Sequence, residues 1–68
     1  MKLRWTDAVD LAIELKRLHP GVNPLAVRFT DLHRHVCAIP GFDDDPKASN
    51  EGILERIQMA WLEEVEDD

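Results

Sequence analysis

Three consecutive aspartates, Asp43, Asp44 and Asp45, are the residues whose types and spacing point most directly to chemistry. Carboxylates crowded into one turn repel one another, so this arrangement costs stability unless a cation or a basic surface relieves the repulsion. Hard cations such as Fe²⁺, Mg²⁺ and Ca²⁺ accept such oxygen ligands. The alternative is a solvated acidic loop in which Asp45 caps the turn at Pro46. Residue types alone leave both interpretations open.

The spacing around these aspartates excludes an EF-hand. Counted from Asp43, the sixth position is Ala48, where that loop requires glycine, and the twelfth is Leu54, where it requires a bidentate glutamate. The residue types therefore predict at most an open, carboxylate-rich and weak metal site.

A second acidic run, residues 63–68, follows at the end of the last predicted helix. The helix macrodipole disfavours anions at a C-terminal end by about 0.3–1 kcal/mol each, so helix stability does not explain the run. A frayed, solubilising tail is one interpretation. The other is that the last helix packs back beside the aspartates and forms one acidic end of the molecule. The candidate ligands for a weakly bound cation are then Asp43, Asp44, Asp45, Glu63, Glu64 and Glu66.

The last predicted helix also carries Met59 and Leu62 on the side opposite its main apolar face. An apolar pair bordered by carboxylates suits a docking surface with a hydrophobic centre and a charged rim. The alternative is that the two side chains cover a neighbouring loop. The predicted partner-binding residues are Met59 and Leu62 together with Asp43, Asp44, Asp45, Glu63, Glu64 and Glu66.

The charge is divided unevenly along the chain. Residues 41–68 carry a net charge of −8 and residues 1–40 a net charge of +2, which together give −6. Nucleic-acid binding needs a basic stripe, so this balance argues against DNA or RNA as a partner. A basic protein is the more natural partner.

The chain is short, and its 68 residues leave room for one domain, residues 1–68. An enzyme cleft of ordinary depth does not fit in so small a body, so we expect a protein that is not an enzyme and holds no tightly bound cofactor. Cys37 is the single cysteine, and neither an apolar leader nor a membrane-spanning run is apparent. We therefore expect a cytoplasmic protein without a membrane partner.

One residue pair has the spacing of metal ligands. His33 and Cys37 are four residues apart on one predicted helical stripe, which can seat two ligands on one metal. Two ligands do not complete a structural zinc site, and no second pair follows at zinc-finger spacing. A cysteine packed near the core is the favoured interpretation.

Apolar spacing and stop signals predict the first two helical segments. A helix should run from about Thr6, its cap, to Leu18, and His19-Pro20-Gly21 should end it. Asn23 should cap a short helical turn over about Pro24 to Val27. The predicted buried residues of the first helix are Ala8, Val9, Leu11, Ala12, Leu15 and Leu18.

Two further helices follow. Thr30 should cap the third, which buries Leu32, Val36 and Ile39 and ends at Pro40-Gly41. The fourth should span about Asn50 to Glu64, with Ser49 or Asn50 as its cap. Its predicted apolar face consists of Ile53, Leu54, Ile57, Ala60, Trp61 and Val65.

These elements predict a mainly α fold: a small winged-helix-like or helix-turn-helix body of about four helices with at most a minimal β ribbon. Lys2-Leu3-Arg4 could pair with Val27-Arg28-Phe29 to form that ribbon. The third helix would read DNA in such a fold. It offers only Arg34 as a reliable cation between His33 and His35, so a DNA-binding protein remains the alternative rather than the preferred function.

The chain resembles the IscX (YfhJ) family of small acidic proteins of bacterial iron-sulfur cluster assembly. The blocks that carry the resemblance span nearly the whole chain: Trp5-Thr6-Asp7, residues 27–33, Phe42-Asp43-Asp44-Asp45-Pro46 with residues 48–51, residues 53–55 and Trp61-Leu62-Glu63-Glu64. A departure lies at Arg34-His35, where relatives tend to carry Gln-Trp, and it affects the packing beside the third helix.

The resemblance implies an adaptor role. Members bind the PLP-dependent cysteine desulfurase of the pathway through an acidic surface, compete with frataxin and ferredoxin for its basic patch, modulate sulfur release and bind ferrous iron weakly. In this chain that acidic role falls on Asp43, Asp44, Asp45, Glu63, Glu64 and Glu66. A primary iron donor is the further alternative, which sequence does not separate from a regulator.

Overall fold

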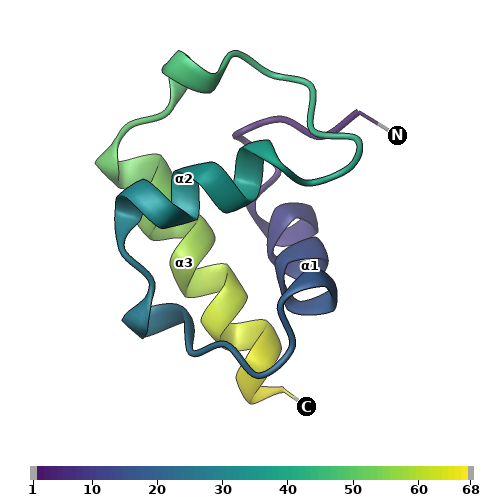
Figure 1. The fold of residues 1–68 in the computed structure, drawn as a ribbon, viewed down its shortest axis with the longest axis vertical. Helices are drawn as coiled ribbons and strands as arrows, with labels where there is room; N and C mark the ends of the chain where they lie inside the picture. The colour runs from purple at the N-terminus through teal and green to yellow at the C-terminus, as the bar shows by residue number, and fades with distance from the viewer. Residues whose placement is uncertain (1, 68) are drawn as a thin grey trace.

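The computed structural model describes residues 2–67, which form three α-helices and two 3-10 turns (Figure 1). In chain order the elements are α1 (Ala8–Leu18), η1 (Pro24–Ala26), α2 (Phe29–Cys37), η2 (Pro46–Ala48) and α3 (Glu51–Glu66). The prediction of a mainly α fold is confirmed. Of the four predicted helical segments, three are α-helices, and the short turn expected near Pro24 is η1.

Two of the predicted helix caps are present. The Asn50 side chain accepts a hydrogen bond from the backbone N–H of Ile53 at 2.9 Å, so Asn50 rather than Ser49 caps α3. The Asn23 side chain accepts from the N–H of Leu25 at 3.1 Å and starts η1 in the same way. Both asparagines satisfy an N–H group that has no partner inside the helix.

The other two predicted caps are wrong. Thr6 precedes α1 by two residues because residues 4–7 form a separate turn, in which the Asp7 carboxylate accepts from the N–H of Arg4 at 2.9 Å. Thr30 lies inside α2, whose first residue is Phe29. The Phe29 side chain packs against the core, which explains why the helix begins two residues earlier than a cap at Thr30 would place it.

The core lies between α1 and α3, which pack along one another, and α2 contacts both (Figure 1). The predicted residues of α2 are buried, as are both tryptophans. Val9, Leu18 and Val65 are exposed by 61%, 37% and 37%, so their predicted burial is wrong. Val9 lies on the opposite side of α1 from the buried Leu11. The buried apolar residues are Leu3, Trp5, Ala8, Leu11, Ala12, Leu15, Leu32, Val36, Ile39, Leu54, Ile57 and Trp61.

The N-terminal segment pairs with a different partner from the one predicted. Leu3 forms an isolated parallel bridge with Phe42: its N–H donates to Gly41 O at 2.8 Å, and its carbonyl accepts from the N–H of Asp43 at 2.8 Å. The ribbon predicted with residues 27–29 is therefore wrong. Residues 2–67 contain no β-strand that could form a wing, so the winged-helix likeness is not confirmed.

Candidate functional site

The segment of Asp43, Asp44 and Asp45, here called the Asp loop, is bound to the N-terminal segment through Asp44. One carboxylate oxygen of Asp44 accepts from the N–H of Trp5 at 3.1 Å, and the other accepts from the N–H of Asp45 at 2.7 Å. These two bonds, helped by the charge of Arg4, hold the pKa of the Asp44 carboxyl below its usual range. Asp44 therefore stabilises the loop itself, because both of its carboxylate oxygens accept backbone hydrogen bonds.

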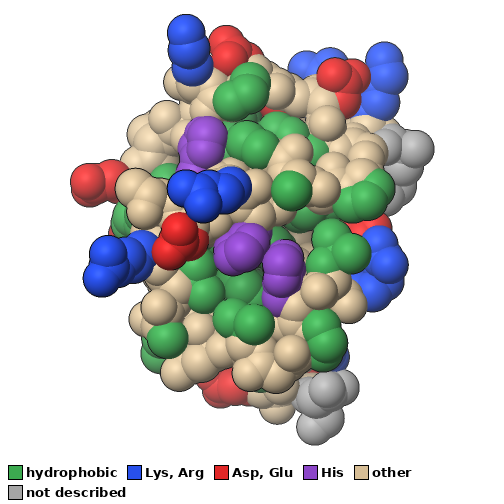
Figure 2. All heavy atoms as spheres, viewed as in Figure 1, with side chains coloured by type: hydrophobic (Ala, Val, Ile, Leu, Met, Phe, Trp, Pro, Cys, Tyr) green, Lys and Arg blue, Asp and Glu red, His purple; other side chains and the backbone are tan. Residues whose placement is uncertain are grey.

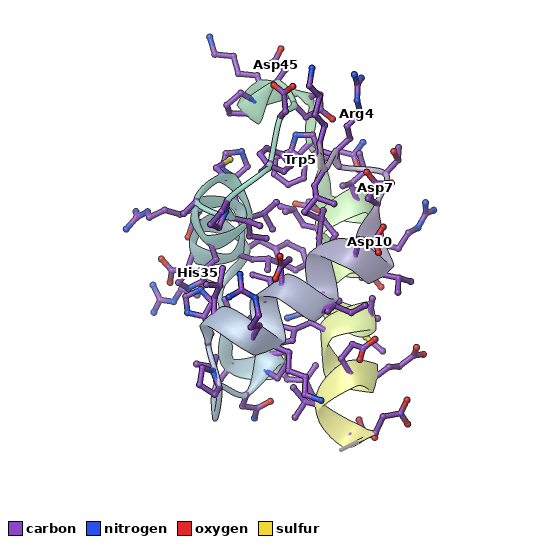
Figure 3. All side chains as sticks on the ribbon, turned by 90° about the vertical axis from the view of Figure 1, so that its right-hand side faces the viewer. Arg4, Trp5, Asp7, Asp10, His35 and Asp45 are labelled. Atoms are coloured by element: carbon purple, nitrogen blue, oxygen red, sulfur yellow. The ribbon has the colours of Figure 1, made fainter. Side chains whose placement is uncertain are left out.

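Trp5 holds the same loop from inside. Its ring is 3% exposed, and its Nε1–H donates to the carbonyl of Asp45 at 2.7 Å. The ring meets Phe42 edge-on with centroids 4.9 Å apart and lies 5.3 Å from the His33 ring. Figure 3 shows Asp45 above Trp5 at one end of the molecule. We call Trp5, His33, Phe42, Asp44 and Asp45 the tryptophan clasp.

The two remaining carboxylates of the Asp loop differ in the contacts that they make. Asp45 accepts from the N–H of Lys47 at 2.9 Å, which confirms its predicted role as the cap of the turn at Pro46. Asp43 pairs with Lys2 at 3.6 Å, with both side chains more than half exposed, so this ion pair adds little stability. Of the three carboxylates in the loop, that of Asp43 contributes least to holding the fold.

The second acidic run lies far from the first. The Asp loop is at the top of Figure 1, α3 begins beneath it, and the C-terminal end of α3 is at the bottom of a molecule 30 Å long. The prediction of one shared acidic end is therefore wrong. Glu63 and Glu66 are exposed and Glu64 is half-buried. Within residues 2–67 no three His, Cys, Asp or Glu side chains are close enough to hold a metal ion together.

The outer face of α3 carries the predicted apolar pair. Met59 is 47% exposed and Leu62 is half-buried. Gln58, one helical turn before Leu62, donates from Nε2 to the carbonyl of Pro24 at 2.9 Å and fixes η1 against α3. Leu25, which follows Pro24 in η1, is 60% exposed, and η1 itself packs against α3. Sequence reasoning missed Leu25, because no periodicity is readable in a three-residue turn.

The histidines of α2 are engaged within the fold. His33 donates from Nε2 to the carbonyl of Pro46, and its Nδ1 lies 3.9 Å from Cys37 Sγ. Burial raises the pKa of the Cys37 thiol, consistent with the predicted cysteine packed near the core. The His35 ring contacts that of His19. Arg34 is left as the exposed cation of α2, which offers DNA little to bind.

Among the depressions on the surface of residues 2–67, two have the residue types to be considered as binding sites. One of about 290 Å³ is lined by Phe29, Thr30, His33 and Leu54. A smaller one, of about 120 Å³, lies beside His19. Neither is a deep cleft with converging polar groups of the kind that binds a substrate. No helix of the described part of the chain is long and apolar enough to cross a membrane.

Comparison with known proteins places these features in a family. A family model described as iron-sulphur cluster assembly matches residues 3–66. A protein of Pseudomonas aeruginosa, named uncharacterized protein PA3808, is 50% identical over 64 residues, covering 94% of this chain and 97% of that protein. The match includes both the tryptophan clasp and the outer face of α3, and it confirms the resemblance found in the sequence.

Proposed function

The chain belongs to the iron-sulphur cluster assembly family, and we propose from this premise that it is a non-enzymatic acidic adaptor of the cysteine desulfurase that supplies sulfur. In this role it docks on a basic surface of the desulfurase and modulates sulfur transfer. Frataxin and ferredoxin compete with it wherever they use the same basic surface. The desulfurase and these competitors follow from the resemblance to IscX, and the physical support comes from α3 and the Asp loop.

The observation that carries the proposal is a set of exposed carboxylates without internal partners. Glu55, Glu63 and Glu66 are exposed on α3, and none of them forms an ion pair among residues 2–67. Their charge is not used to stabilise the fold, so it remains available to a partner. Such a field speeds the encounter with a basic surface and disfavours acidic partners.

The same face of α3 supplies an apolar centre. Met59 is its exposed member, and Leu62 lies half-buried one turn after Gln58. Leu25 is exposed on η1, which Gln58 fixes against α3. A docking surface derives affinity from desolvated apolar contacts at its centre, while a charged rim sets orientation and association rate. The acidic docking surface is therefore extended along α3 instead of being concentrated at one end of the molecule.

The Asp loop contributes to this surface mainly through Asp43. Asp44 accepts two backbone hydrogen bonds and Asp45 caps a turn, so their substitution disturbs the loop itself. Asp43 makes only an exposed ion pair with Lys2. A test that replaces all three aspartates mixes docking with folding, whereas Asp43→Asn isolates docking.

Weak binding of ferrous iron, as a cargo or effector, is part of the proposal. The carboxylate of Asp43 suits Fe²⁺. Water would complete the coordination, because no group of three ligand side chains lies together among residues 2–67. Glu63 and Glu66 offer a second open position at the far end of α3. An Fe²⁺ titration followed by NMR should shift amide resonances near Asp43 or Glu63, and unshifted spectra would remove iron from the proposal.

The direct test is calorimetric titration of the cysteine desulfurase with the full chain and its variants. Glu63→Gln and Met59→Gln should each weaken binding several-fold, because one removes a rim charge and the other the apolar centre. Asp10→Asn is the matched control, since it removes one exposed carboxylate from α1 (Figure 3). Equal affinity of Glu63→Gln and Asp10→Asn would show that α3 is not the docking face.

A further inference from the structure

The histidine pair at the junction of α1 and α2 has no role in the proposed docking surface. His19 occupies the C-cap position of α1, and His35 lies in the last turn of α2. Their ring centroids are 4.3 Å apart with the rings tilted by 50°. Figure 2 shows two histidine side chains touching in the middle of one face of the molecule. These two imidazoles, distant in sequence, have thus been brought into contact by the fold.

Both rings have the chemistry of metal ligands. Imidazole nitrogen suits borderline divalent cations such as Zn²⁺. Each ring is half-buried, and within residues 2–67 neither makes a hydrogen bond from its nitrogens, unlike His33, whose Nε2 is bound to the carbonyl of Pro46. The nitrogens of His19 and His35 are therefore available to an ion at the surface.

We propose that His19 and His35 form a two-histidine site for Zn²⁺ that ties the end of α1 to α2. The depression of about 120 Å³ beside His19, which Pro20 and Gly21 line and His35 does not, gives room for water molecules on the His19 side of the ion. Lys16 and Val65 complete this lining. The charge of Lys16 opposes the ion and the net charge of −6 of the chain favours it. With two protein ligands, the remaining coordination positions are filled by water, and binding is reversible.

No local pattern indicates this pair, because His35 lies sixteen positions after His19. The His33 and Cys37 spacing drew attention instead. That pair is a poorer candidate, since the raised pKa of the Cys37 thiol disfavours the thiolate that binds zinc. The two pairs lie on the same helix but are tested separately by substitution.

Zinc titration of the full, reduced chain, followed by NMR and calorimetry, tests the site. The ring resonances of His19 and His35 should shift together with one zinc per chain. The indole N–H of Trp61 should shift as well, because its ring lies 6.3 Å from that of His19. The indole of Trp5, which lies against His33, should not shift.

Variants decide which residues hold the ion. His19→Gln and His35→Gln should each weaken zinc binding at least about tenfold, since loss of even an outer partner of a metal ligand costs about 10–100-fold. His33→Gln and Cys37→Ala are the controls and should bind as the parent chain does. Unchanged zinc affinity in both His19→Gln and His35→Gln, or loss of binding in either control, would overturn the proposal.

Thermal unfolding gives a second readout that does not depend on any partner. Zinc at a free concentration of 100 times its dissociation constant should lower the unfolded fraction about 100-fold in the parent chain. At the same zinc concentration His19→Gln, which binds zinc at least about tenfold more weakly, should lower its unfolded fraction by about tenfold or less while still folding, as its circular dichroism would establish. Equal stabilisation of parent and variant would place the zinc elsewhere and refute the site.

Discussion

Replacing Trp5 by phenylalanine tests the tryptophan clasp, and Trp61→Phe is its matched control. Both indoles are buried, with exposures of 3% and 0%. Trp5 Nε1–H donates to the carbonyl of Asp45 at 2.7 Å, whereas Trp61 Nε1 has no hydrogen-bond partner in the described part of the chain. The two substitutions remove the same atoms, but Trp5→Phe breaks a hydrogen bond, whereas Trp61→Phe removes a buried N–H group that has no partner.

The structure gives the size of the difference. Trp5→Phe loses a hydrogen bond with a net value of about 1 kcal/mol, and Trp61→Phe removes a buried unpaired donor that costs about 1–3 kcal/mol. Trp61→Phe leaves the more enclosed cavity, which reduces the difference. Trp5→Phe should therefore be the more destabilising substitution by about 2 kcal/mol. For a domain of this size that corresponds to a Tm about 8–16 °C below that of Trp61→Phe.

Urea and thermal unfolding of the two variants measure this difference directly. Hydrogen exchange adds a local readout, because Trp5→Phe should speed exchange of the N–H of Asp45 and Lys47, which are held in the Asp loop. The reasoning is refuted if Trp61→Phe is as destabilising as Trp5→Phe, or if the exchange of the Asp loop is the same in both.

Three further predictions concern stability. Asp44→Asn should remove part of the acid sensitivity of folding. The pKa of the Asp44 carboxyl is lowered in the folded chain, so this group stabilises the fold above the ordinary aspartate range and loses that contribution as pH falls through the folded pKa. Urea midpoints measured against pH test this, with Asp43→Asn as the control. Asn50→Ala should cost about 1 kcal/mol through loss of the α3 cap, and an unchanged Tm would contradict this. Gly21→Ala should destabilise the turn after α1, where φ is +83°, although nothing lies within 4 Å of an added Cβ; a stability equal to the parent would show that the turn relaxes.

Local signals in the sequence were sufficient for much of the fold. The stop at residues 19–21, the cap at Asn50 and the buried face of α2 depend on neighbouring residues, and all three are present. The caps predicted at Thr6 and Thr30 failed because tertiary contacts decided the helix starts. The turn around Asp7 delays α1, and packing of Phe29 brings α2 forward.

The candidate site was harder to predict because its arrangement depends on long-range packing. Nothing local shows that Leu3 pairs with Phe42, or that Asp44 binds the backbone of Trp5, 39 residues away. Sequence reasoning therefore assigned no structural role to Asp44 and offered one shared acidic end as one of two interpretations. The structure separates the two acidic runs along α3 and assigns Asp44 to the clasp.

The salt dependence of binding to the cysteine desulfurase tests the central claim most directly. The dissociation constant should rise steadily with ionic strength, because exposed charges are screened. The combined variant Glu55→Gln, Glu63→Gln and Glu66→Gln should bind more weakly and show a shallower salt dependence than the parent chain. An affinity that is insensitive to salt, or a combined variant with the parent's affinity and slope, would contradict the account of α3 as an acidic docking surface.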